Sequence, residues 1–262
     1  RSFYRCIKNR KIKMKNLIEI SKKYKTTKKM MGFINIYEKY LKEHRNKKIN
    51  LLEIGVENGE SLRMFSNYFN NAKIIGLDII EKKYNIKNTE IFCGNQTDKK
   101  ILFKIIKKYK SLDIIIDDGS HQNSDIKKSF SYLFPKLKLG GLYIIEDLQT
   151  SYVSNWGGDG NNFNNKKTTM NFIRSLADRM HYQDIDNPFY KKNKFDGMIE
   201  FVHIYRNIAF IKKGKNFYES NICYKNSWYL GLKKNRNNFD FKSFRDFKYY
   251  IKYFFRHIFR KI

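Results

Sequence analysis

The chain has 262 residues, of which 41% are hydrophobic and 16% aromatic, a composition typical of a folded domain rather than a disordered chain. Cys6, Cys93 and Cys223 are widely separated and form no CxxC pair, which argues against a disulfide framework or a zinc ribbon and suits a reducing compartment. No apolar run approaches the ~20 residues that span a membrane, and the basic N-terminal region lacks the apolar stretch of a secretory signal. We therefore expect a cytoplasmic protein. Because the sequence opens with Arg1, we expect the natural start to lie upstream or at Met14.

The formal net charge of +29 allows two interpretations. It could attract nucleic acid, an anionic lipid surface or an acidic substrate. It could also reflect a composition in which Lys, Asn and Ile are abundant throughout, since no recognised nucleic-acid motif accompanies the charge. We favour the second interpretation and expect no nucleic-acid partner. A nucleic-acid (RNA) methyltransferase or a basic RNA-binding protein is kept as an alternative function.

Along the chain, helical patterns alternate with short apolar runs that end in turn residues. Two helices are expected first, at residues 16–23 and 33–43. The expected strands follow at residues 50–54, 73–78, 90–93, 113–117, 142–146, 199–205 and 208–212. Helices are expected between them at residues 61–69, 99–109, 124–133 and 168–180. This alternation predicts an α/β fold with a doubly wound, mostly parallel, seven-stranded Rossmann-like sheet.

The last two expected strands are separated only by Arg206 and Asn207. So short a connection predicts a hairpin, and the sheet should therefore have an antiparallel edge. Residues 155–167, which read NWGGDGNNFNNKK, have the composition and length of a loop that covers a site; an ordinary solvated loop is the alternative.

Three regions are expected: lid-like N-terminal helices at 1–48, the main domain at 49–214, and a basic, aromatic C-terminal extension at 215–262. Within the extension, residues 239–262 have apolar residues at helical spacing surrounded by Lys and Arg. Such an amphipathic helix could lie on the inner surface of a membrane. It could equally pack on the domain or on a second subunit of a homo-oligomer.

The segment LLEIGVENGES at residues 51–61 predicts a buried strand, a tight turn at Gly55 and Gly59, and a helix. It lacks the three-glycine spacing of a dinucleotide fingerprint, which disfavours NAD. Glu53 suggests a cationic or hydrogen-bonding ligand. Asp78 ends the second strand, where an acid can hold the two hydroxyls of a ribose, although it could also cap a helix. Together these features point to S-adenosylmethionine.

Two neighbouring strands end in pairs of acids. DIIIDDGSHQ at residues 113–122 delivers Asp117 and Asp118, and LYIIED at residues 142–147 delivers Glu146 and Asp147. Since parallel strands end on the same side of a sheet, we expect these carboxylates to converge, which requires a cation. Oxygen ligation suits Mg²⁺ or a similar divalent ion. Helix capping could explain one acid of each pair, but not both.

His121 lies three residues after Asp118. Because oxygen ligands for the ion are already available, we predict that His121 is the general base that accepts a proton from a metal-polarised hydroxyl. A histidine at the start of a helix without chemistry is the alternative.

The segments LLEIGVENGESLRMF, IIGLDI, DDGSH and GGLYIIEDLQTSY together resemble class I S-adenosylmethionine-dependent O-methyltransferases of the macrocin and mycinamicin type, which are related to the cephalosporin hydroxylase and rhamnosyl O-methyltransferase group. The resemblance covers about residues 24–213. It implies metal ligands at Asp118, Glu146 and Asp147 and a catalytic base at His121. It also implies cofactor contacts at Glu53, Gly55, Ser61 and Asp78, with Asn95 and Gln96 near the adenine. We predict Gly59 and Asp117 as further cofactor contacts.

Two segments depart from the family pattern. The family commonly has G-D-Q where this chain has Gly94, Asn95 and Gln96, and its KYGTDKG signature reads KYKTTKK at residues 23–29. The resemblance implies that the second segment helps to close the site.

The leading prediction is a metal-dependent S-adenosylmethionine O-methyltransferase that acts on a hydroxyl of a sugar or glycan. Amino-methylating nucleic-acid enzymes usually have an N/D-P-P-Y/F motif where this chain has Asp-Asp-Gly-Ser. A hydroxylase-like relative or a non-catalytic scaffold of the same fold is a further alternative.

Overall fold

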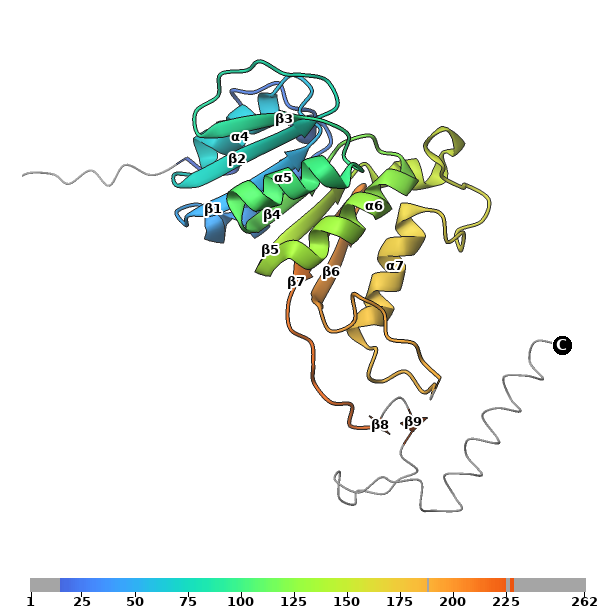
Figure 1. Cartoon of the computed structure of the whole chain (residues 1–262). Coiled ribbons are helices and arrows are strands. Elements are labelled where there is room, and N and C mark those ends of the chain that lie inside the picture. The colour runs from blue at the N-terminus through green and yellow to red at the C-terminus, as the bar shows by residue number, and fades with distance from the viewer. Residues whose placement is uncertain (1–14, 188, 225–226, 229–262) are drawn as a thin grey trace, which may run out of the picture.

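The computed structural model describes residues 15–187, 189–224 and 227–228. Its centre is a seven-stranded sheet in the order β3-β2-β1-β4-β5-β7-β6 (Figure 1). The prediction of a doubly wound, Rossmann-like sheet is confirmed. The strands are β1 (Ile49–Ile54), β2 (Ala72–Asp78), β3 (Thr89–Cys93), β4 (Leu112–Asp117), β5 (Leu137–Glu146), β6 (Ile199–Tyr205) and β7 (Ile208–Lys213).

The five strands β1 to β5 run parallel to one another, so their carboxyl ends meet at one edge of the sheet. β4 lies between β1 and β5, and every residue of this strand is buried. Its isoleucines alternate: Ile114 and Ile116 pack into one core layer and Ile115 into the other. A strand covered on both faces needs apolar side chains on both, which explains the continuous Ile run.

Helices cover both faces of the sheet. One core layer joins it to α1 (Leu17–Ser21), α3 (Phe33–Leu41) and α4 (Glu60–Tyr68). The other joins it to the three helices on the near face in Figure 1, which are α5 (Lys99–Tyr109), α6 (Asn123–Leu133) and α7 (Thr169–Met180).

The edge hairpin is also confirmed, since β7 is antiparallel to both β5 and β6. The two-residue connection contains Asn207 with a φ of 64°, and asparagine tolerates this left-handed conformation better than most residues.

The structure adds elements that the sequence did not predict. A four-residue helix α2 (Thr27–Met30) begins within the KYKTTKK segment, and β5 begins five residues before its expected start. The 3-10 helices are η1 (Lys42–His44), η2 (Phe134–Lys136), η3 (Leu148–Tyr152) and η4 (Ser154–Trp156), and a small hairpin joins β8 (Cys223–Tyr224) to β9 (Ser227–Trp228).

The expected amphipathic helix at residues 239–262 lies outside the described residues. Among the helices that the structure describes, none is long and apolar enough to cross a membrane.

Candidate active site at the carboxyl edge of the sheet

The glycine turn after β1 lies directly against the loop after β4. Gly55 has a φ of 88°, and a Cβ atom there would overlap the backbone carbonyl of Asp118, so both the conformation and the close approach require glycine. Gly59, with a φ of 74°, is the N-cap of α4. Asp78 at the end of β2 holds the turn, because its Oδ2 atom accepts hydrogen bonds from two backbone N–H groups there, at 2.9 and 3.1 Å.

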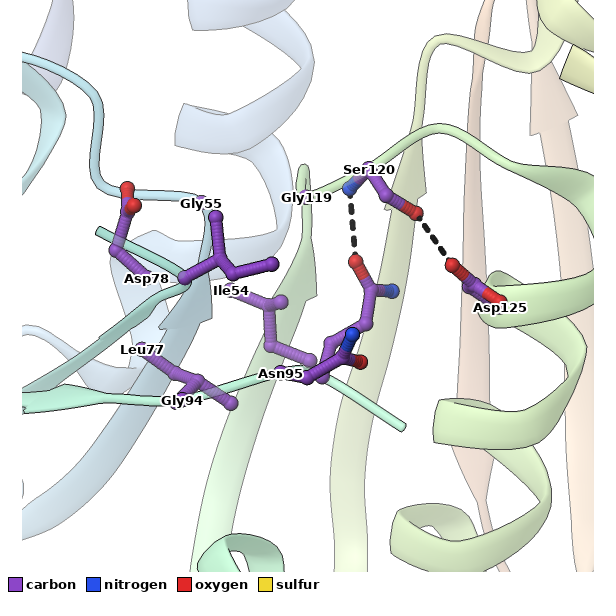
Figure 2. A pocket seen from close by; sticks show the side chains of 11 residues that line it. Ile54, Gly55, Leu77, Asp78, Gly94, Asn95, Gly119, Ser120 and Asp125 are labelled. Carbon is purple, nitrogen blue, oxygen red and sulfur yellow. Dashed lines mark hydrogen bonds between the residues drawn. The ribbon is translucent and has the colours of Figure 1, made fainter. Parts of the chain in front are cut away.

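A pocket opens beside this turn (Figure 2). Figure 2 shows Gly55 and Asp78 on one side of the pocket and Ser120 with Asp125 on the other. Apolar groups and a few polar ones line it, as is usual for small-molecule sites. The residues that line it are Ile54, Gly55, Leu77, Asp78, Ile79, Gly94, Asn95, Gln96, Gly119, Ser120 and Asp125. Four predicted cofactor contacts, Gly55, Asp78, Asn95 and Gln96, are therefore brought together.

Gln96 connects the pocket wall to the sheet. Its Oε1 atom accepts a hydrogen bond from the backbone N–H of Ser120 at 2.7 Å, and its Nε2 atom donates to Asp117 at 3.1 Å. The amide thus fixes the spacing between the loops that follow β3 and β4.

Asp117, also predicted to contact the cofactor, is buried among protein donors rather than placed on the pocket wall. Its carboxylate accepts hydrogen bonds from Gln96, from Ser129 at 2.5 Å and from Tyr143 at 2.8 Å. Burial raises the pKa of Asp117 to about 6, although these hydrogen bonds oppose the rise. The placement gives this acid a role in joining β4 to α6 and β5.

Glu53 and Ser61 form a second pair of polar side chains near the glycine turn. Glu53 is fully buried, and its Oε2 atom accepts a hydrogen bond from Ser61 at 2.8 Å. Burial raises the pKa of Glu53, and the nearby ammonium of Lys28 opposes that rise. Ser61 also lines a smaller pocket together with Lys25, Thr26, Thr27, Lys28, Val56, Glu57, Asn58, Glu60 and Asp118.

Asp118, His121 and Asp147 converge at the ends of β4 and β5. One ligand atom of each lies within 4.8 Å of the others, and the Nε2 atom of His121 is 3.5 Å from Oδ2 of Asp147. His121 and Asp147 have φ angles of 56° and 54°, which are uncommon for residues other than glycine. Such conformations are concentrated at functional sites. All three side chains are half-buried.

Glu146, the third predicted ligand, faces a different partner. Its Oε1 atom accepts hydrogen bonds from Nζ of Lys28 at 2.6 Å and from the hydroxyl of Tyr37 at 2.5 Å. Burial, followed by the charge of Asp118, raises the pKa of Glu146, and the ammonium of Lys28 opposes that rise. The structure therefore does not bring Glu146 into the cluster of Asp118, His121 and Asp147; the Lys28 ammonium lies between Glu146 and Asp118.

The donor set of the cluster fits a hard divalent cation. Two carboxylates supply oxygen ligands, which Mg²⁺ prefers, and an imidazole is tolerated by related ions. With two ligating carboxylates, several positions of an ion would stay open for water or a substrate oxygen. The imidazole beside Asp147 can alternatively accept a proton.

Lys28 and Tyr37 are site residues that sequence reasoning missed. Lys28 is one of 54 Lys and Arg residues, and its position in a short polar segment gives no signal of burial. The signal that could have identified Lys28 is its position in KYKTTKK, which corresponds to a family segment expected to help close the site. Tyr37 lies in the apolar pattern of α3, where an aromatic residue indicates a core position.

Comparisons with known proteins identify relatives with the expected chemistry. No family model matches the chain. It is 35% identical over 214 residues to mycinamicin VI 2''-O-methyltransferase of Micromonospora griseorubida, covering 77% of this chain and 53% of the relative. It is 34% identical over 212 residues to demethylmacrocin O-methyltransferase of Streptomyces fradiae, covering 77% and 54%. The chain thus spans about half the length of these curated relatives.

A solved structure agrees with these matches. The MycE methyltransferase of the mycinamycin biosynthetic pathway, in complex with Mg and SAH, superposes with a TM-score of 0.75 at 34% sequence identity, covering 78% of this chain and 56% of that one. The resemblance predicted from the sequence is therefore confirmed.

Proposed function

We propose that this chain, a homologue of the macrocin- and mycinamicin-type sugar O-methyltransferases, transfers a methyl group from S-adenosylmethionine to a hydroxyl of a sugar or glycan. A divalent cation, Mg²⁺ or similar, would be bound during the reaction. The observation that carries the proposal is the placement of Asp118, His121 and Asp147 next to the pocket of Gly55, Asp78 and Asn95, at the ends of adjacent strands. A methyl donor and a polarised acceptor would meet at that edge.

The residues divide into three roles. The pocket beside Gly55 would hold the nucleoside of the methyl donor, with Asp78 and Asn95 as polar contacts and Gln96 as a support. Glu53 and Ser61, near the smaller pocket, would face the amino-acid part. Asp118 and Asp147 would hold the cation; whether Glu146 joins them stays a prediction, because Lys28 holds its carboxylate here.

His121 would accept the proton of the acceptor hydroxyl, and Asp147 orients its imidazole. When bound, the cation would lower the pKa of that hydroxyl, and S-adenosylmethionine would supply the methyl group. The acceptor oxygen would bond to the methyl carbon as the carbon–sulfur bond breaks, with the electron pair left on sulfur. Most of the acceleration would come from holding the two reactants in line.

A methyl-transfer screen tests the proposal. The full chain would be incubated with methyl-labelled S-adenosylmethionine and a panel of nucleotide sugars, deoxysugar glycosides and glycans, with Mg²⁺ or with EDTA. We expect label in at least one sugar acceptor in Mg²⁺ and none in EDTA. Binding of S-adenosylhomocysteine, measured by calorimetry in parallel, reports on the cofactor pocket without an acceptor. A chain that neither binds it nor transfers label would contradict the proposal and favour the non-catalytic alternative.

No specific observation on the described residues favours the nucleic-acid or the hydroxylase-like alternative. Three expectations stay predictions. They are a cytoplasmic location, membrane contact or oligomerisation through residues 239–262, and the division of the chain into regions at 1–48, 49–214 and 215–262.

A further inference from the structure

Lys28 places one ammonium group among three carboxylates. Its Nζ atom lies 2.6 Å from Asp118 Oδ2, 2.6 Å from Glu146 Oε1 and 3.0 Å from Glu53 Oε1. The lysine is 1% exposed. The ammonium donates hydrogen bonds to Asp118 and Glu146, and it forms an ion pair with Glu53.

The three acids come from three neighbouring strands. Glu53 lies in β1, Asp118 directly follows β4, and Glu146 ends β5, and these strands are adjacent in the sheet. Lys28 comes from α2, outside the sheet. One side chain therefore connects the predicted donor-binding acid Glu53 with Asp118 of the metal cluster.

Charge balance requires such a group. Buried carboxylates that face one another repel strongly unless a cation lies between them. Within the described part of the chain, the ion pairs of Glu53, Asp118 and Glu146 are all with Lys28. The carboxylate of Asp118 belongs both to this group and to the cluster with His121 and Asp147.

The segment that carries Lys28 is anchored on both sides. Before it, the backbone N–H of Lys25 donates to Glu60 of α4 at 2.9 Å. After it, Tyr37 of α3 donates to the same Glu146 oxygen that Lys28 contacts. The N-terminal helices thus bring two donors to one carboxylate.

We propose that Lys28 is a positioning residue that acts as an internal counter-ion: it holds Glu53, Asp118 and Glu146 together before a divalent cation binds. This inference rests on the proposed function for the metal site but requires neither the methyl donor nor the acceptor. It has two consequences. The protein without metal depends on Lys28 for the order of the site, and the ammonium weakens cation binding by repulsion.

The test compares the wild-type chain with Lys28→Met, which keeps the length of the side chain and removes its charge. Thermal unfolding would be followed with EDTA and with saturating MgCl₂, and Mg²⁺ affinity would be measured by calorimetry. Without metal, Lys28→Met should unfold at a lower Tm, because three carboxylates lose their counter-charge. Saturating Mg²⁺ should raise its Tm by at least about twice the wild-type increment. Its Kd for Mg²⁺ should fall by at least about tenfold.

A lysine that serves only for packing gives a different result. Lys28→Met would then lose the same stability with and without Mg²⁺, and its Mg²⁺ affinity would equal that of wild type; this outcome overturns the inference. Lys29→Met, at the exposed neighbouring position, is the matched control and should change neither quantity. If the wild-type chain binds no Mg²⁺, the proposed metal site is refuted, and the inference about Lys28 that rests on it is refuted as well.

Lys28→Met could fail to fold without metal. In that case, refolding in Mg²⁺ should recover far-UV circular dichroism and a cooperative transition, whereas failure in both conditions overturns the inference. Lys28→Arg, which keeps the charge, should fold without metal and show the wild-type dependence of Tm on Mg²⁺; loss of either would also overturn it.

Discussion

The Nε2 atom of His121 lies 3.5 Å from Oδ2 of Asp147, although the two residues follow different strands. Both have a left-handed backbone, which turns their side chains toward each other at the edge of the sheet. We predict that His121→Ala lowers kcat by at least about 100-fold, because the acceptor hydroxyl loses its proton acceptor. Affinity for S-adenosylhomocysteine should stay within about twofold of wild type. Steady-state kinetics measures the change in kcat, and calorimetry measures the affinity for S-adenosylhomocysteine.

The matched control is His181→Ala. The side chain of His181 is 72% exposed at the end of α7, so its removal should leave both quantities unchanged. Wild-type turnover in His121→Ala would refute the assignment of this histidine as the base.

Metal removal gives a second prediction. If Asp118 and Asp147, which lie together at the site, are the oxygen ligands proposed above, EDTA should abolish methyl transfer, and added Mg²⁺ should restore it. Asp147→Asn should weaken Mg²⁺ binding by at least about tenfold, since it removes one of the charged ligands. Asp159→Asn, on a half-buried acid of the loop after η4 that is not part of the cluster, is the control and should bind Mg²⁺ as wild type does. Full activity of a thoroughly chelated enzyme would be incompatible with the metal site.

The sheet and the two acid-bearing strand ends could be predicted because their signals are local. Ile114, Ile115 and Ile116 form a continuous apolar run, and only a strand covered on both faces makes such a run favourable. The two-residue connection before Ile208 left little choice other than a hairpin. Strand direction then brought Asp118 and Asp147 to the same edge.

What could not be predicted depends on the direction of side chains and on distant partners. Adjacent acids such as Glu146 and Asp147 look equivalent in sequence, but Glu146 is the last residue of β5, whereas Asp147 follows the strand with a left-handed backbone. Glu146 points to Lys28 and Tyr37, and Asp147 points to His121. The contact between Lys28 and Asp118 joins residues 90 positions apart, and nothing in the short polar segment around Lys28 indicates that its ammonium is buried.

The buried imidazole of His44 predicts a loss of stability in mild acid. Its side chain is 11% exposed, and burial lowers the pKa of His44; Glu43 and Asp113 oppose this effect, while Lys47 and Lys212 add to it. The unfolded chain then binds the proton more tightly than the folded one. The histidine's contribution to stability is therefore present above its unfolded pKa and is lost as the pH falls below about 6.5.

Urea unfolding of wild type and His44→Gln between neutral and mildly acidic pH measures this contribution. The difference in unfolding free energy between the two proteins should shrink as the pH falls through this range. His181→Gln, at an exposed position, should follow the wild-type profile. A difference that stays constant with pH would show that protonation of His44 is not coupled to unfolding.

Gly55 gives a prediction that separates backbone strain from steric overlap. Gly55→Ala would force an L residue to a φ of 88° and drive its Cβ atom into the carbonyl of Asp118. Gly140→Ala meets only the backbone strain, since Gly140 has a φ of 81° and no heavy atom lies within 4 Å of its added Cβ.

We expect Gly140→Ala to lower the unfolding free energy by about 1 kcal/mol and Gly55→Ala by more than about 3 kcal/mol. Gly55→Ala should also weaken S-adenosylhomocysteine binding, because Asp118 and the pocket wall must move apart. If urea unfolding shows equal destabilisation of the two variants, the turn after β1 can move without disturbing the loop after β4. The close contact between Gly55 and Asp118 would then not align the pocket with the metal cluster.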